Sequence, residues 1–149
     1  MSTTDRIEKQ VHLRAPQPRV WRAITDSQEF GTWFQAKVDG PFVAGTSVGG
    51  RSTYPGHEDA RFIFAVETIE PETLFSFRWG PPEADPSNGA QDPSRLVEFR
   101  LETIDGGTML TIVESGFDTV ALERRAETYS GNVEGWNIQA ENIRQHVGG

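Results

Sequence analysis

One carboxylate stands out among the side chains that could carry chemistry. Glu114 continues the alternation of Leu110 and Ile112 along an apolar segment, and residues two apart on a strand point to the same face of a sheet. The spacing therefore predicts that Glu114 points inward with its apolar neighbours. Two interpretations stay open: a polar anchor or acid–base group inside a cavity, or a strand-end side chain that reaches water at the mouth of a cavity.

The charge of Glu114 depends on its partners. Without a cationic partner, burial favours the protonated form of a carboxylic acid, and Glu114→Gln is then expected to raise stability at neutral pH. Arg78 is a poor cationic partner because it alternates away from its neighbours Phe77 and Trp79. The better candidates are uncharged donors: the indole of Trp136, the side-chain amide of Asn132 and the hydroxyl of Tyr54.

Other catalytic and metal-binding patterns are missing from the sequence. It has no cysteine, which excludes disulfides, thiolate catalysis and zinc–cysteine sites. His12, His57 and His146 are scattered without metal-site spacing, and we expect each at the surface. Ser115 lacks the G-x-S-x-G context of a nucleophile elbow, and the segment 45–50 lacks the lysine of a phosphate-binding loop. We expect no metal and no cofactor.

The composition limits the class of protein and its partners. The 149 residues, 36% of them hydrophobic, predict one globular domain over 1–149. A net charge of −8 argues against nucleic acid and anionic membranes as partners. The N-terminus has no apolar signal region, and no run approaches 18 apolar residues. We therefore expect no membrane insertion and a cytoplasmic location.

The elements that must position Glu114 follow from hydrophobic spacing. Alternation predicts a first strand over 7–13. A short helix is predicted next, with Pro18 in its first turn. A second short helix, capped by Asp26 or Ser27, is predicted to end at Phe34. From 38 to 116 the period is two, which predicts about six antiparallel strands, with tight turns at 70–73 and 105–107. The polar segment 80–94, rich in proline, predicts a mobile loop.

A long helix is predicted from about Thr119 to His146. At 26 residues, its apolar stripe from Leu122 to Val147 would span roughly 39 Å, enough to cross a sheet about 30 Å wide. Gly131 and Gly135 interrupt this helix at a cost of about 1 kcal/mol each against alanine. They project opposite the stripe, and we expect them to let the helix bend along a curved sheet. The alternative is close packing against another helix or subunit near Ile138.

Several motifs in order resemble a known family. They are PRVWRAITD, FGTWF, EPETLFSFRW, GGTMLTIVESGF and a GW pair inside the last helix. From Asp5 to Val147 the chain resembles the START-like (SRPBCC) superfamily, in the branch of the activator of heat-shock protein 90 ATPase homologues. The resemblance implies an α+β helix-grip fold: a curved antiparallel sheet of six to seven strands around a long C-terminal helix, with two short helices after the first strand and an apolar cavity.

The expected function is binding of a small apolar or amphipathic molecule in that cavity, as a carrier or sensor. The alternatives are a cyclase- or aromatase-like enzyme with Glu114 as acid or base, which should show a second polar residue facing Glu114, and a chaperone-associated adaptor, which should lack an open cavity. The aromatic rows fit a cavity wall and a packed core about equally, and a monomer or a homodimer is expected. The candidate ligand-binding residues are Trp33, Phe34, Tyr54, Phe62, Phe64, Phe75, Phe77, Trp79, Phe99, Glu114, Tyr129, Asn132 and Trp136.

Overall fold

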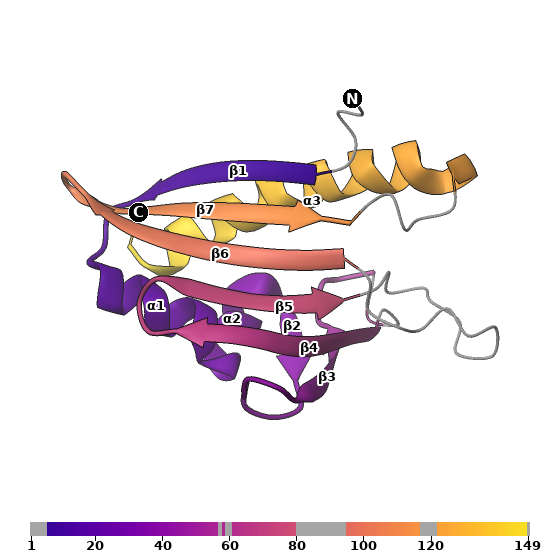
Figure 1. Ribbon diagram of the computed structural model, residues 1–149, viewed down its shortest axis with the longest axis horizontal. Coiled ribbons are helices and arrows are strands. Elements are labelled where there is room, and N and C mark those ends of the chain that lie inside the picture. The colour runs from indigo at the N-terminus through magenta and orange to yellow at the C-terminus, as the bar shows by residue number, and fades with distance from the viewer. Residues whose placement is uncertain (1–5, 57, 59–60, 80–94, 117–121, 149) are drawn as a thin grey trace.

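A computed structural model describes residues 6–56, 58, 61–79, 95–116 and 122–148, and the side chains of 122–128 are left aside. Seven antiparallel strands form one sheet in the order β1-β7-β6-β5-β4-β3-β2 (Figure 1). This is the α+β helix-grip arrangement that the sequence predicts. The elements are β1 (Arg6–Leu13), α1 (Gln17–Thr25), α2 (Ser27–Phe34), β2 (Ala36–Val38), β3 (Ser47–Ser52), β4 (Arg61–Glu70), β5 (Leu74–Trp79), β6 (Arg95–Ile104), β7 (Gly107–Ser115) and α3 (Leu122–His146).

The short turns fix how the central strands pair. Strands β6 and β7 are joined by a two-residue turn in which Gly106 has a φ of 82°, a conformation that glycine adopts without strain. A side chain at Gly107 would meet the carbonyl oxygen of Leu13 at 2.0 Å, so the start of β7 lies directly against the end of β1. The β4–β5 connection likewise follows the predicted turn, since β4 ends at Glu70 and β5 begins at Leu74.

The two short helices begin where the sequence predicts. α1 has proline in its first turn, and the side chain of Asp26 accepts hydrogen bonds from the amides of Gln28 and Glu29 at the start of α2. α2 ends with Gln35 in the left-handed conformation, at a φ of 62°. This tight end directs the chain into β2 and leaves the aromatic side chains of α2 facing the sheet.

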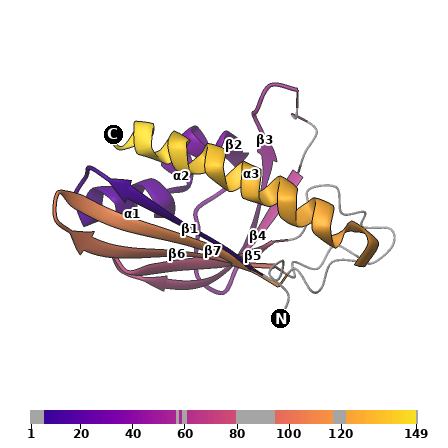
Figure 2. The ribbon, with the colours of Figure 1, turned by 90° about the horizontal axis from the view of Figure 1, so that it is seen from above.

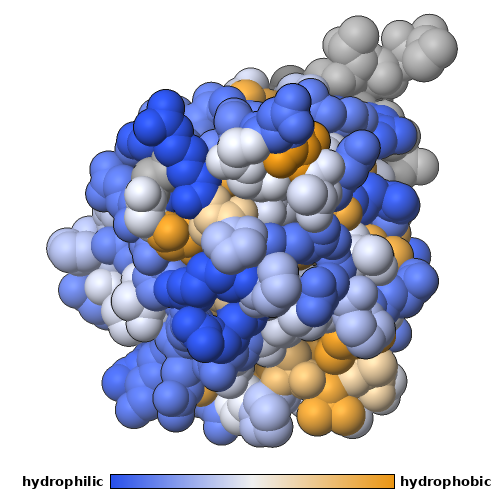
Figure 3. Space-filling model, turned by 90° about the vertical axis from the view of Figure 1, so that its left-hand side faces the viewer, coloured by the Kyte–Doolittle hydropathy of each residue, from blue (hydrophilic) through white to orange (hydrophobic). Residues whose placement is uncertain are grey.

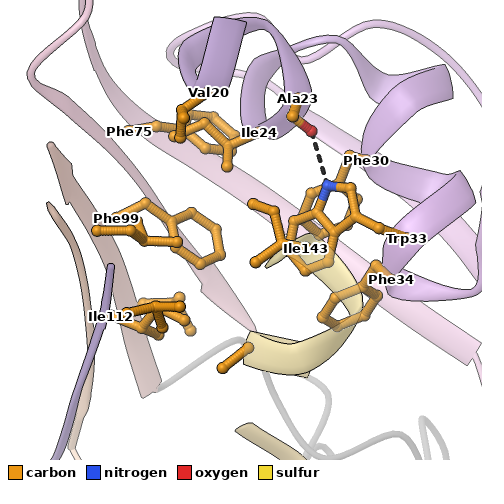
Figure 4. Packing of buried hydrophobic residues seen from close by; sticks show 14 of the residues in the cluster. Val20, Ala23, Ile24, Phe30, Trp33, Phe34, Phe75, Phe99, Ile112 and Ile143 are labelled. Atoms are coloured by element: carbon orange, nitrogen blue, oxygen red, sulfur yellow. Dashed lines mark hydrogen bonds between the residues drawn. The ribbon is translucent and has the colours of Figure 1, made fainter. Parts of the chain in front are cut away.

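The core lies between the sheet, the two short helices and α3. Figure 2 shows α3 crossing the sheet diagonally, and Ala140 and Ile143 from its C-terminal half are buried, as is Val147 directly after it. Figure 4 shows the rings of α2 packed against strand side chains and Ile143, with the Trp33 indole donating to the carbonyl oxygen of Ala23 at 2.8 Å. The predicted helix before Leu122 and the predicted loop 80–94 lie outside the described residues.

A cluster of charges ties the ends of the three helices together. Glu29 of α2 accepts from Arg19 and Arg22 of α1, each at 2.7 Å, and lies 3.0 Å from Nε2 of His146. His146 was expected at the surface, yet its side chain is only 19% exposed because α3 ends against α2. His12 is exposed as expected, and His57 lies outside the described residues.

The end of the molecule that carries α1 and the strand turns is mostly hydrophilic, with small separate hydrophobic groups (Figure 3). Within the described residues, no helix has the length and apolar character needed to cross a membrane. The same part of the chain holds no group of three potential metal ligands. The large apolar side chains of the central strands, among them Phe64, Phe77 and Phe99, are fully buried.

Candidate functional site

Glu114 is the centre of a buried polar cluster. Its side chain is 0% exposed, so the interpretation in which it reaches water at a cavity mouth is wrong. Oε2 accepts from Nε1 of Trp79 at 2.7 Å and from Nε of Arg95 at 2.9 Å. Oε1 accepts from Nε1 of Trp136 at 2.8 Å and from Nδ2 of Asn132 at 2.9 Å. The carboxylate thus connects β7, its own strand, to β5, β6 and α3.

Strand register brings three of these side chains together. Val97 of β6 is paired with Glu114 of β7, and Trp79 of β5 is paired with Arg95 of β6. Arg95 is therefore diagonal to Glu114 on the same face, within reach of a long side chain. α3 completes the cluster because Asn132 and Trp136 lie four residues apart, one helical turn, and face the sheet together.

Arg95 changes the expected electrostatics of Glu114. Its side chain is 3% exposed and forms a buried ion pair with Glu114, so the assumption of a carboxylate without a cationic partner is wrong. All four contacting side chains donate, and this set matches an ionised carboxylate, which can only accept. The predicted partners Trp136 and Asn132 are confirmed, whereas Trp79 and Arg95 were missed. Arg78 points outward to Glu67, at 2.6 Å, as the alternation indicated.

A cavity of about 170 Å³ lies beside this cluster, between α3 and the sheet. Glu114 does not line the cavity, but four of the lining side chains donate hydrogen bonds to its carboxylate. The rings of Phe62 and Trp79 are stacked with centroids 6.0 Å apart, and those of Trp79 and Trp136 with centroids 5.8 Å apart. The lining residues are Phe34, Phe62, Trp79, Arg95, Gly131, Asn132, Gly135, Trp136 and Gln139.

The two glycines of α3 border this cavity. A Cβ atom at Gly131 or Gly135 would meet no other atom within 4 Å, which excludes close packing of these positions against another part of the described chain. Both residues also line the cavity, Gly131 as an exposed residue and Gly135 as a half-buried one, so the cavity reaches the side of α3 that lies away from its apolar stripe. α3 is continuous through both glycines, and they leave bare helix backbone where a side chain would otherwise occupy the cavity.

The structure separates the candidate ligand-binding residues into groups. Phe34, Phe62, Trp79, Asn132 and Trp136 line the cavity, and their contact with a ligand stays a prediction. Phe64, Phe75, Phe77 and Phe99 are 0% exposed and belong to the packed core.

The remaining candidates lie elsewhere. Trp33 borders a separate hollow between α2 and α3. Tyr129 donates to the carbonyl oxygen of Arg6 at 3.1 Å, and Tyr54 is 42% exposed. The cavity is therefore concentrated at one end of the aromatic rows, and the rest of those rows forms the core.

Four lining residues were missed from the sequence. Gln139 joins α3 to the end of α2 by donating to the carbonyl oxygen of Phe34 at 3.0 Å. A signal for Arg95 was present, since a two-residue turn at 105–106 places Val97 opposite Glu114 and Arg95 two residues earlier on the same face. Gly131 and Gly135 were expected to allow a bend, and nothing in the sequence indicated that they border a cavity.

The chemistry of the cluster is that of a rigid support. Each carboxylate oxygen of Glu114 already accepts at least two hydrogen bonds, and a general base needs a lone pair directed at a substrate proton. The cluster instead fixes the rotamers of Trp79, Asn132 and Trp136, which lowers the conformational entropy that a ligand would have to remove on binding.

Solved structures share this fold at low sequence identity. A protein from Arthrobacter aurescens is 22% identical with a TM-score of 0.79, over 97% of this chain and 86% of that one. Protein Ms6760 from Mycobacterium smegmatis is 21% identical with a TM-score of 0.76, over 95% and 90%. The Aha1 dimer from Colwellia psychrerythraea is 14% identical with a TM-score of 0.72, over 95% of both chains.

Sequence comparison assigns the family. The search of curated proteins found no match. The family model described as "Activator of Hsp90 ATPase homolog 1-like protein" matches residues 14–148, which is nearly the whole chain and includes both the cavity and the Glu114 cluster. The chain belongs to this family of activator of Hsp90 ATPase homolog 1-like proteins.

Proposed function

We propose that the protein reversibly binds a small apolar or amphipathic molecule in the cavity between α3 and the sheet, without catalysing a reaction. The observation that carries this proposal is the cavity of about 170 Å³, with aromatic side chains on its walls and bare helix backbone at Gly131 and Gly135. Concave, mostly apolar sites with a few fixed polar groups are typical of small-molecule binding.

The alternative of a cyclase- or aromatase-like enzyme has weaker support. Arg95 and Asn132 are polar residues that face Glu114, as that alternative requires, but both donate to its carboxylate. Their hydrogen bonds occupy the acceptor positions that an acid–base role would use. The chaperone-associated adaptor is also less favoured, because it was expected to lack an open cavity.

Ligand-observed NMR with a mixture of small aromatic and aliphatic compounds tests the proposal. Gly135→Leu places a side chain in the cavity, and Glu134→Leu makes a comparable change at an exposed position of the same helix. We expect some compounds to bind the wild type and Glu134→Leu but not Gly135→Leu. Binding of no compound, or equal binding to all three proteins, contradicts the proposal.

A further inference from the structure

We propose that the ligand of this cavity is an uncharged molecule with a single aromatic ring. The inference rests on the proposed binding function and adds the size, shape and charge of the ligand. Each of the three follows from a different property of the lining: its volume, its aromatic faces with the bare backbone beside them, and the charge balance between Arg95 and Glu114.

The size of the ligand follows from the volume. The cavity holds about 170 Å³, and an engineered protein cavity of about 150 Å³ is known to hold benzene. One six-membered ring with a small substituent therefore fills the space. A fused two-ring compound or a long acyl chain would extend beyond this volume on the side where Gly131 is exposed, and its outer part would gain no apolar contact.

The flat shape follows from the walls. Phe62 and Trp79 are stacked with 22° between their planes, and Trp79 and Trp136 with 28°. Aromatic rings pack favourably on such faces in offset or edge-to-face arrangements. Where α3 borders the cavity, Gly131 and Gly135 present backbone without a Cβ atom. This part of the wall is flat, so a planar molecule can lie against it, and it offers no side chain for a branched aliphatic group to contact.

The neutral charge follows from the ion pair. Of the described residues that line the cavity, Arg95 alone carries a charge. The carboxylate of Glu114, 2.9 Å from Nε of Arg95, balances this positive charge. An anionic ligand near Arg95 would also lie near the buried carboxylate behind it, and a cationic ligand would be repelled by Arg95 itself. A charge moved from water into this site lacks a counter-charge of its own, and uncompensated burial of a charge is unfavourable.

A series of matched compounds tests the three properties. Benzamide, benzoate and benzamidinium have nearly the same size and shape but are neutral, negative and positive. Naphthalene-2-carboxamide adds a ring, and hexanamide replaces the ring by a chain. The indole N–H signals of the four tryptophans report binding in protein NMR spectra, because Trp79 and Trp136 line the cavity whereas Trp21 and Trp33 do not and serve as internal controls.

We expect benzamide to shift the Trp79 and Trp136 signals selectively, and each other compound to bind at least tenfold more weakly. Gly131→Ala with Gly135→Ala should weaken benzamide binding at least fivefold, and Asn137→Ala, at an exposed position of α3, should leave it unchanged. If a charged, two-ring or aliphatic compound shifts the same signals as strongly as benzamide, this inference is overturned and the binding function stands. If no compound shifts them, the binding function itself is overturned.

Discussion

Trp79 and Trp136 stack with ring centroids 5.8 Å apart, and both indole N–H groups donate to the same carboxylate. One ring comes from the sheet and the other from α3, so this pair fixes the distance between the two layers beside the cavity. The carboxylate of Glu114 sets the orientation of both rings, and its removal should affect the cavity and the fold together.

Glu114→Gln should lower the free energy of unfolding by about 3–5 kcal/mol, the range observed when one partner of a buried ion pair is removed. The substitution leaves Arg95 buried without its counter-charge and turns one acceptor oxygen into a donor that faces other donors. This reverses the expectation from sequence, which assumed no cation beside Glu114. Urea denaturation at neutral pH measures the change.

Glu67→Gln provides the control for this experiment. Glu67 pairs with Arg78 at 2.6 Å, with side chains that are 42% and 41% exposed, and exposed pairs contribute about 1 kcal/mol or less. An equal loss of stability in the two variants would show that the Glu114 cluster does not hold the layers together.

Stability in acid should depend on Glu29. Burial raises the pKa of this carboxyl, but the hydrogen bonds from His146, Arg19 and Arg22 and the charge of Arg19 outweigh it and lower the pKa from 4.5 to about 2. A lowered pKa in the folded state gives stability that is present above about pH 4.5 and lost as the pH falls toward 2.

Glu29→Gln should therefore destabilise the protein at pH 6, and this effect should fade between about pH 4.5 and 2. The shift sets an upper limit of roughly 3 kcal/mol, and contact with water brings the expected value closer to about 1 kcal/mol. Thermal unfolding as a function of pH measures it, with Glu102→Gln, at an exposed position of β6, as the control. A difference that is constant across this pH range contradicts the assignment.

Gly131→Ala with Gly135→Ala should stabilise the protein by about 1–2 kcal/mol, the gain in helix propensity. If the glycines allow the bend that the sequence suggested, the same substitutions should instead give a gain near zero or a loss. Added Cβ atoms meet no other atom within 4 Å, so nothing nearby opposes the substitutions. Chemical denaturation decides between the two, and a loss would restore the bend as the explanation.

Gly31→Ala should have the opposite effect, although this glycine also lies in a helix. A Cβ atom at Gly31 would be 2.2 Å from the carbonyl oxygen of Ala36, a backbone atom that cannot move aside without shifting β2. Overpacking of this kind costs about 1–3 kcal/mol. Chemical denaturation of the single variants Gly31→Ala and Gly131→Ala compares the same substitution at a crowded and at an open position. Equal changes in the free energy of unfolding would contradict the close contact between Gly31 and Ala36.

Much of the fold could be predicted from the sequence because local signals agreed with it. The Asp26 cap, the turn at 105–107 and the alternation that turned Glu114 inward each depend on residues close together in the chain. The partners of Glu114 depend on register between strands, and only the β6–β7 turn carried that information for Arg95. That Gly131 borders a cavity could not be predicted, because a hydrophobic stripe shows which side of a helix faces the core and carries no information about a cavity beside that side.

The two halves of α3 are held unequally, and this has a kinetic consequence. The C-terminal half buries Ala140 and Ile143, whereas Gly131 is exposed and a Cβ atom there would meet no other atom within 4 Å. Amide protons near Gly131 should therefore exchange with solvent through local unfolding, whereas those near Ile143 should exchange only when the whole protein unfolds. The cavity borders this turn, so the exchange rate of the proposed ligand should follow the local mobility of the turn and be insensitive to the stability of the whole protein.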